Sequence, residues 1–302
     1  MDSCTQKRSV RWLVGICMVL VLLACGAAAA AEDESGGEPL PILRFGTTAR
    51  VWGMGNAGVA AARGVEGLYY NPAALAYVVR PELSISHSRL GEASDLNFAA
   101  AALPITDRGS LGAGLLLLSS AGIPRTPDDI DKPPAGTFDY IQAVAYIGTG
   151  MEIAKGCSAG LTVKGIFGEL DEEQCRGYSL EGGLRQQVNE VLTIGFLARD
   201  VIGEMNWSTG RVEELPTQFL GGATLSLLDG NLLVSGQTDP EFKDWGVGAE
   251  YNIGGYLQLR GGYVEDSITA GAGLGFGHIQ LDYTWTGRES GGTHRVSFGV
   301  RF

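Results

Sequence analysis

Histidine, a side chain much used in acid–base catalysis and metal binding, is scarce in this sequence. It occurs three times in 302 residues, at positions 87, 278 and 294, without the close spacing of metal ligands. No HExxH or GxSxG motif is present. His87 lies between two serines, but neighbouring strand residues point to opposite faces, so it cannot easily activate either serine. The sequence therefore predicts a protein that is not an enzyme and has no catalytic residues, metal centre or cofactor.

Two acidic runs leave an alternative open for metal binding. They lie at 128–131 and 169–173 and contain Asp128, Asp129, Asp131, Glu169, Asp171, Glu172 and Glu173. Such runs can bind Ca²⁺ or bridge lipopolysaccharide through divalent ions. We favour the commoner interpretation, that they are solvated loop residues.

Basic residues are also few, and the net charge is −12. Removal of residues 1–31 takes away a net charge of +2 (Lys7, Arg8, Arg11 and Asp2) and leaves −14. A basic surface of the kind that binds nucleic acid is therefore absent, and nucleic acid is excluded as a partner.

Cysteine is sparse as well: only Cys157 and Cys175 follow residue 31. They lie at unequal distances from the acidic turn between them, so they are not obvious cross-strand partners. A disulfide in an oxidising compartment stays open, but two free thiols are the favoured interpretation.

Long apolar runs are confined to the N-terminus, where the sequence is typical of a signal peptide. Three basic residues precede the apolar run "WLVGICMVLVLLAC", and a small-residue run follows it. Cleavage after Ala31 is favoured over a retained anchor, and residues 1–31 form the predicted signal peptide. "LLAC" also resembles a lipobox, in which Cys25 would be lipidated. Either outcome exports the mature chain.

Glycine is abundant, with 46 residues, and the chain after residue 83 alternates between apolar and polar residues. In "QLDYTWT", Leu281, Tyr283 and Trp285 alternate with polar residues, which is the period of a strand. No convincing amphipathic helix interrupts the pattern. We count about fourteen such segments, near 83–90, 95–103, 110–119, 138–147, 157–168, 177–186, 190–199, 217–227, 230–238, 244–252, 256–264, 267–276, 278–286 and 293–302.

The connections between these segments fall into two classes. Those after odd-numbered segments are mostly long and charged, including 120–137 and 200–216, whereas those after even-numbered segments are mostly tight. Bacterial outer-membrane β-barrels sort their loops in this way, with long loops outside the cell and short turns in the periplasm. The sequence predicts an all-β, transmembrane antiparallel barrel of about fourteen strands, and a soluble all-β fold is the weaker alternative. Charges facing the lumen should pair across it: Lys164, Glu181, Arg185, Glu250, Arg260, Asp282 and Arg301.

Gly53-Met54-Gly55-Asn56-Ala57-Gly58 matches G-x-G-x-x-G, the fingerprint of dinucleotide-binding domains. That fingerprint needs a βαβ unit and an acidic residue about 20 positions on. Here Glu66 comes too early and no strand–helix alternation follows, so a Rossmann domain is rejected. The small residues suit a segment packed closely inside the barrel, where Asn71-Pro72 predicts a turn or cap.

The block "ARVWGMGNAG…NPAALA" resembles the N-terminal signature of PorV/PorQ proteins, within the FadL-like outer-membrane superfamily. The matching residues are Ala49, Arg50, Gly53, Met54, Gly55, Ala57, Asn71, Pro72, Ala73, Leu75 and Ala76. Asn56 and Ala74 replace two family glycines, and "ARGVEG" stands where relatives carry acidic residues. The resemblance implies an acidic linker and luminal plug over 32–82, ahead of a barrel over 83–302. It also implies that the terminal Phe302 belongs to the signal for the barrel-assembly machinery.

Two functions follow from the resemblance. The PorV-like signature implies a protein of a type IX-like secretion system that binds or shuttles exported cargo, in contact with secretion-system subunits. The wider FadL-like superfamily implies passive transport of a hydrophobic ligand, gated by the plug. Both place the chain in the bacterial outer membrane, with lipid and lipopolysaccharide as partners.

Overall fold

The computed structural model describes residues 40–91, 94–125, 136–287 and 292–302 as one unit. The predicted signal peptide, Cys25 and the acidic run at 128–131 lie outside the described residues. Within the described chain, no helix is both long enough and apolar enough to cross a membrane.

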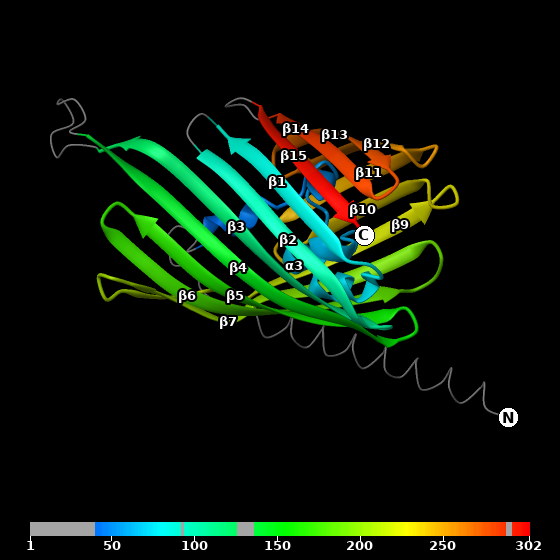
Figure 1. The fold of residues 1–302 in the computed structure, drawn as a ribbon, viewed down its shortest axis with the longest axis horizontal. Helices are drawn as coiled ribbons and strands as arrows, with labels where there is room; N and C mark the ends of the chain where they lie inside the picture. Colours follow the sequence, from blue (N-terminus) through cyan, green and yellow to red (C-terminus); the bar gives the residue numbers. More distant parts are fainter. Residues whose placement is uncertain (1–39, 92–93, 126–135, 288–291) are drawn as a thin grey trace. The chain divides into compact units, whose positions relative to one another are not determined.

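The described chain forms a closed antiparallel β-barrel, as predicted (Figure 1). Neighbours in sequence are neighbours in the sheet, and β1 pairs with β15 to complete the ring. All fifteen strands except the three-residue β8 belong to this ring, which gives the fourteen predicted. The strands are β1 Glu82–Leu90, β2 Ser94–Thr106, β3 Gly109–Pro124, β4 Thr137–Ala154, β5 Cys157–Leu170, β6 Glu173–Gln187, β7 Leu192–Trp207, β8 Val212–Glu214, β9 Gln218–Leu227, β10 Leu232–Thr238, β11 Trp245–Ile253, β12 Leu257–Val264, β13 Ser267–Phe276, β14 Ile279–Gly287 and β15 Thr293–Arg301.

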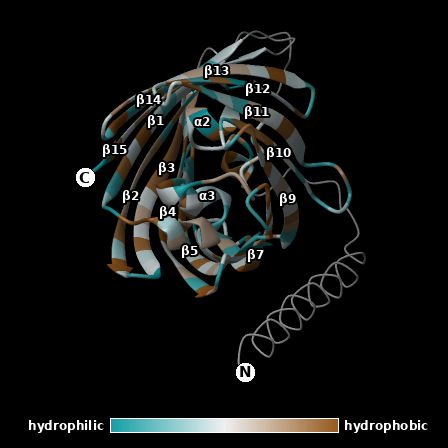
Figure 2. Cartoon of the chain, turned by 90° about the vertical axis from the view of Figure 1, so that its right-hand side faces the viewer, coloured by the Kyte–Doolittle hydropathy of each residue, from teal (hydrophilic) through white to brown (hydrophobic). Residues whose placement is uncertain are grey.

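On β10 to β15 and on β1, most apolar residues point away from the lumen. On β14, Tyr283 and Trp285 are 43% and 40% exposed, whereas the intervening Thr284 is fully buried inside. Figure 2 shows the resulting bands of hydropathy along the strands. A soluble barrel would show the reverse arrangement, so this outer face is suited to lipid.

Connections of two kinds lie at the two ends of the barrel. At one end, here the short-turn end, every connection is short, from the two residues 107–108 to the four residues 188–191 and 228–231. The other end, here the long-loop end, holds the connections after β1, β3, β5, β7, β10, β12 and β14. The predicted sorting of the connections is confirmed in outline.

Several predicted loops are wrong, because the strands β3 to β7 run further than their apolar alternation. Residues 120–124 extend β3, and most of 200–216 belongs to β7 and β8. In the acidic stretch at 169–173 only the turn at 171–172 is not strand, and the connection between β4 and β5 is the two residues 155–156. The outer ends of β3 to β8, here the protruding sheet, extend to the left in Figure 1. Polar and apolar residues mix on both faces there, so the alternation that marks a strand in the sequence is weak.

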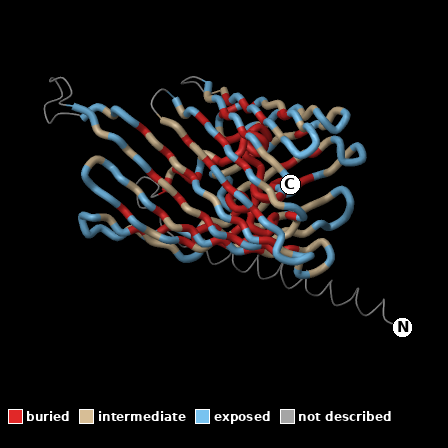
Figure 3. The backbone as a smooth tube through the Cα atoms, viewed as in Figure 1, coloured by how far each residue is buried: buried red, intermediate tan, exposed pale blue. Residues whose placement is uncertain are grey.

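Five short helices lie inside the ring and form the plug (Figures 1 and 2). They are η2 Pro41–Arg44, α2 Ala49–Trp52, η3 Gly64–Glu66, α3 Gly67–Tyr70 and η4 Pro72–Tyr77. Figure 3 shows buried residues concentrated at this level of the barrel. The predicted plug at 32–82 therefore corresponds, in its described part, to residues 40–81, and the barrel begins at Glu82.

The plug segment follows the inner wall around most of its circumference. Ala49 contacts β14 and β15, Gly55 contacts β13, and Ala57 contacts β10. Asn71 then reaches β6 and β7, and Leu75 reaches β3.

Glycines of the inner wall permit this close approach. A Cβ on Gly262 of β12 would lie 2.6 Å from the Met54 carbonyl carbon, and one on Gly248 of β11 would lie 2.5 Å from the same atom. Much of the glycine content is therefore explained by backbone packed on backbone.

We expect Gly262→Ala to lower the free energy of unfolding by about 1–3 kcal/mol, because the added methyl overlaps plug backbone that cannot move aside. Gly261→Ala is the matched control, since its Cβ has nothing nearer than the Thr269 carbonyl oxygen at 4.0 Å. Urea unfolding of both variants in lipid vesicles measures the difference. Equal stability of the two variants would show that the plug backbone moves to accommodate the added methyl group.

Candidate functional site

Polar side chains that point inward from β10, β13, β14 and β15 hold the first part of the plug, residues 49–59. The Ala49 N–H donates to Ser297 Oγ at 2.7 Å, and the Thr284 hydroxyl donates to the Ala49 carbonyl at 2.6 Å. The N–H groups of Gly58 and Val59 both donate to Gln237 Oε1, at 2.8 and 3.1 Å. Buried backbone polar groups need such partners, and the wall provides them in place of a regular helix or sheet.

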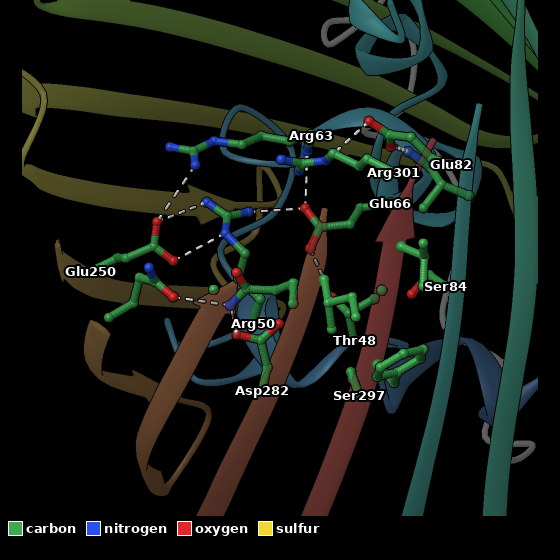
Figure 4. Close-up of a pocket in the computed structure, with 18 of the residues that line it drawn as sticks. Thr48, Arg50, Arg63, Glu66, Glu82, Ser84, Glu250, Asp282, Ser297 and Arg301 are labelled. Carbon is green, nitrogen blue, oxygen red and sulfur yellow. Dashed lines mark hydrogen bonds and ion pairs between the residues drawn. The ribbon is translucent and has the colours of Figure 1, made fainter. Parts of the chain in front are cut away.

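An ionic centre joins the plug to the wall (Figure 4). Arg50 of α2 lies 2.9 Å from Glu66 of the plug and 3.0 Å from Glu250 of β11. Arg260 of β12 bridges Glu250 and Asp282 of β14, at 2.7 Å from each. All five groups are buried, and each charge has an opposite charge within ion-pair distance, as buried charges require.

The protonation of the plug residues follows from this arrangement. Burial alone would lower the pKa of Arg50, but the carboxylates of Glu250 and Glu66 outweigh it and raise that pKa above its usual value. The charge of Arg50, together with partial burial, lowers the pKa of Arg63 to about 10. Both guanidinium groups therefore stay charged at neutral pH, so the network is ionic under physiological conditions.

Two cavities adjoin the ionic centre. One, of about 360 Å³, lies between the plug and the strands β10 to β15 and β1, and reaches the turns at 230–231 and 277–278. The other, of about 450 Å³, extends towards Arg185 and Glu190. They share four lining residues, so they form one charged vestibule at the short-turn end: Arg63, Glu82, Leu233 and Arg301.

The predicted pairing of lumen charges is confirmed for most of them. In addition to the ionic centre, Lys164 of β5 lies 2.7 Å from Glu181 and 3.1 Å from Asp200, where β7 bulges opposite β6. Arg301 pairs with Glu82 at 3.3 Å. Arg185 differs, because its guanidinium lies 4.8 Å from the centre of the Tyr77 ring.

The predicted motif Asn71-Pro72-Ala73 anchors the far side of the plug. Asn71 caps η4 by accepting from the Ala73 N–H at 3.1 Å, and its amide donates to the Val59 carbonyl at 2.8 Å and to the Leu184 carbonyl of β6 at 3.1 Å. Pro72 packs on glycines of β4 and β5, where a Cβ on Gly160 would overlap its carbonyl group. The motif thus caps a helix and fastens it to the wall.

The glycines of the G-x-G-x-x-G stretch also let the plug pack closely on the wall. A Cβ on Gly53 would meet Thr284 Oγ1 at 2.8 Å, and Gly55, with φ +64°, lies against β11 and β12. Met54 is fully buried. Asn56 has φ +58°, and asparagine tolerates this left-handed region better than most residues, so no glycine is needed at this position.

The opposite side of the inner wall carries a large apolar group beside the buried ions of Lys164, Glu181 and Asp200. Strands β2 to β7 turn inward a group of buried side chains, here the apolar wall: Leu96, Phe98, Leu116, Leu118, Val144, Tyr146, Ile166 and Met205. The plug covers it with Leu40, Ile42, Leu43 and the two tyrosines of α3. Burial raises the pKa of the Tyr69 hydroxyl, which stays neutral, accepts from the Gly46 N–H at 3.1 Å and donates to the Leu43 carbonyl.

Other predicted residues lie apart from the plug interface. Phe302 is exposed at the short-turn end, where its N–H donates to the Pro81 carbonyl at 2.9 Å. Cys157 and Cys175 form no disulfide, because register places them at opposite ends of the β5–β6 pair. In the second acidic run, Asp171 pairs with Arg125 and Glu173 accepts from Ser208. No group of three or more possible metal ligands occurs in the described ranges.

Sequence reasoning missed the neutral residues that fix the plug, chiefly Ser235, Gln237, Thr269, Thr284 and Ser297. Their only signal is the inward position in an alternating strand. That position identifies dozens of candidates, and nothing in the sequence says which of them meet the plug backbone.

No protein-family model matches the chain, and no curated protein matches its sequence. Solved structures match its fold. The toluene transporter TodX of Pseudomonas putida is 13% identical, with a TM-score of 0.64 over 86% of this chain and 99% of that chain. The monoaromatic hydrocarbon channel CymD is 12% identical, with a TM-score of 0.63 over 86% and 98%. A FadL homologue of Pseudomonas aeruginosa is 11% identical, with a TM-score of 0.60 over 85% and 98%.

At this level of identity the similarity establishes the fold, which is a FadL-type barrel. The predicted likeness to the FadL-like superfamily is supported to that extent. Membership of the PorV/PorQ family stays a prediction.

We expect Glu250→Gln to lower the free energy of unfolding by about 3–5 kcal/mol, because it leaves Arg50 and Arg260 buried without their shared carboxylate. Glu241→Gln is the control: Glu241 is an exposed partner of Lys243 at 2.7 Å, and its loss should cost below about 1 kcal/mol. Urea unfolding followed by tryptophan fluorescence compares them. Similar losses would mean that the ionic centre is solvated rather than buried.

Proposed function

We propose that the protein is a non-enzymatic channel of the bacterial outer membrane through which hydrophobic molecules pass by diffusion, under control of the plug. The apolar wall inside the barrel carries this proposal. The supporting observations concern the outer face, the lumen and the attachment of the plug.

The outer face supports the location. Outward-facing apolar residues, an even strand number and short turns at one end are typical of outer-membrane barrels, and the FadL-type fold agrees with them. On this interpretation the long-loop end faces the cell exterior and the short-turn end the periplasm. The proposed signal peptide at 1–31, possible lipidation of Cys25 and a role of Phe302 in recognition by the barrel-assembly machinery belong to the same proposal.

The lumen supports the substrate class. Water-filled porins have polar interiors, whereas β2 to β7 here present buried leucine, phenylalanine, valine and isoleucine side chains to the lumen. An apolar wall lowers the free energy of an apolar solute and gives no advantage to a polar one. The solved structures of similar fold include a barrel described as a toluene transporter.

The contacts between the plug and the wall indicate which part of the plug can move. Residues 49–59 are bonded to the polar wall along their length, whereas η2 lies against the apolar wall. Backbone polar contacts of η2 run to Tyr69 of the plug itself, and Arg44 reaches Glu265 at 3.5 Å on the surface. We infer that η2 moves aside for a passing molecule while residues 49–59 stay in place.

A second candidate is the binding of exported proteins at the cell surface, as the PorV-like signature implies. The protruding sheet favours it, because its carboxylates, among them Glu169, Glu172, Glu204 and Glu214, form an acidic surface beyond the apolar part of the barrel. Stoichiometric exported proteins or secretion subunits in barrel purified from its native membrane would support this role.

The channel is tested with Leu118→Asn, which places an amide in the apolar wall. A buried polar group disfavours an apolar solute by about 1–2 kcal/mol, so we expect uptake of the probe N-phenyl-1-naphthylamine to slow by roughly 5- to 30-fold. Fluorescence of the probe as it enters cells expressing the barrel measures the rate. The heat-modified migration of a folded barrel on gels confirms assembly.

Ser120→Asn is the matched control, because Ser120 lies on the same inner face of β3, two residues further on, and already bonds Ser94 at 2.6 Å. Cells with the Ser120→Asn barrel should take up the probe as fast as cells with the wild-type barrel. Cells with wild-type barrel that take up the probe no faster than cells without it would refute the channel.

A further inference from the structure

Polar residues interrupt the apolar outer face of the barrel where β15, β1 and β2 adjoin. On β9 to β14, all of whose residues are described, no outward-pointing side chain carries a charge. On the neighbouring β15, β1 and β2, five outward positions near the long-loop end hold His294, His87, Arg89, Asp95 and Asn97. A charge on a lipid-facing surface is unfavourable unless it lies near the interface or has a polar partner.

Four of these residues form two cross-strand pairs in register, Arg89 with Asp95 and His87 with Asn97, and His294 bonds Tyr283 of β14 diagonally. Arg89 donates from Nε and Nη2 to the two oxygens of Asp95, at 2.9 and 3.0 Å. His87 Nδ1 lies 2.9 Å from Asn97 Oδ1, and His294 Nδ1 lies 2.7 Å from the Tyr283 hydroxyl. The side chains of Arg89 and His87 are 61% and 57% exposed. The Nη1 group of Arg89 is not used in the bond to Asp95, so it can serve as a donor to a further partner.

An apolar groove of about 390 Å³ adjoins this cluster on the outside of the wall. Strand pairing explains its position: Phe298, Ile85, Ala99 and Leu115 lie side by side across β15, β1, β2 and β3. Ala99 ends at its Cβ between larger neighbours, which leaves the depression. The next row towards the long-loop end is Val296, His87, Asn97 and Leu117, and the row beyond it is His294, Arg89, Asp95 and Ser119.

The three rows therefore change from apolar through mixed to charged along the strand direction. A membrane lipid has the same sequence of chemistries, with an acyl chain below and a charged head group above. The charged row lies towards the long-loop end, which faces the cell exterior in the proposed orientation, so the lipid belongs to the outer leaflet. Guanidinium groups form charge-assisted hydrogen bonds with phosphate, and histidine can add further donors.

We propose that this groove binds one molecule of the phosphorylated glycolipid of the outer leaflet, the lipid A part of lipopolysaccharide. One acyl chain lies over Ala99, and a phosphate contacts Arg89 between His87 and His294. The inference rests on the proposed outer-membrane orientation but not on what passes through the lumen, so it is independent of the channel activity.

The test is native mass spectrometry of the barrel, purified in mild detergent and incubated with bis-phosphorylated lipid A. Two variants change the two parts of the site: Arg89→Ala removes the phosphate donor, and Ala99→Leu fills the groove. We expect each to weaken binding roughly tenfold, since charge-assisted bonds and fit in the groove both contribute. Migration of the folded barrel on gels shows that each variant is assembled.

Matched controls exist for both changes. Ala101→Leu adds the same side chain to the same face of β2, one row outside the groove, where Ala101 pairs with Leu83 and Ala113. Arg211→Ala removes an exposed arginine paired with a carboxylate at 2.9 Å elsewhere at the long-loop end. Both should bind lipid A as the wild type does.

Unchanged binding in Arg89→Ala and Ala99→Leu would overturn the proposal. Equal binding of phosphatidylglycerol, or of lipid A without phosphates, would also overturn it, because the groove would then select no particular head group. A lipid-free dimer sensitive to Ala99→Leu would assign the groove to a second copy of the chain instead. If lipid A binds as expected while probe uptake fails, the site stands and the channel does not.

Discussion

The structure depends on the way in which the barrel wall satisfies the backbone of the plug. Residues 46–60 form hardly any regular secondary structure, so their N–H and carbonyl groups need partners that the segment itself does not provide. Inward-pointing hydroxyl and amide groups of the wall serve as those partners, for example Ser297 and Gln237. Glycines in the wall let the two backbones approach, and the ionic centre of Arg50 and Glu250 fixes the register between plug and wall. Without these contacts a coil inside a closed barrel would leave buried polar groups unpaired.

This attachment divides the lumen into two chemically different sides. The wall from β10 to β15, together with β1, is mostly polar and carries residues 49–59 of the plug, whereas β2 to β7 present the apolar wall beside the buried ions of Lys164, Glu181 and Asp200. The charged vestibule opens at the short-turn end. A molecule moving through the barrel from the other end would meet an apolar surface first and a wet, charged cavity afterwards. That order suits a solute that must leave lipid-like surroundings and be released into water.

The alternation of apolar and polar side chains was enough to predict the strands, but only where the two faces of a strand lie in different environments. The fourteen predicted segments all correspond to strands. In each, the outer face is suited to lipid and the inner face contacts the plug or the lumen, so the two faces differ in the residues that they carry. The prediction failed in the protruding sheet, where β7 continues to Trp207 and is followed by β8. Polar and apolar residues mix on its faces, as with Met205 next to Glu204 and Asn206, so the period of two carries little contrast in hydropathy. The same reasoning explains why the predicted loop at 200–216 is mostly strand.

The sequence by itself determined the barrel: the period of two set the strands, the sorted connections set its two ends, and the small-residue block with Asn71-Pro72 marked the plug. Tertiary structure alone decided which of many inward serines and threonines hold the plug, because Ala49 and Ser297 are 248 residues apart and no local pattern records their contact. It also decided that the lumen has an apolar side. Inward leucines of β3 alternate with outward leucines, and a strand that is apolar on both faces gives no indication of which face is inside. Closure of the ring around the plug makes that choice, since it buries the face that fits the plug and leaves the other to lipid.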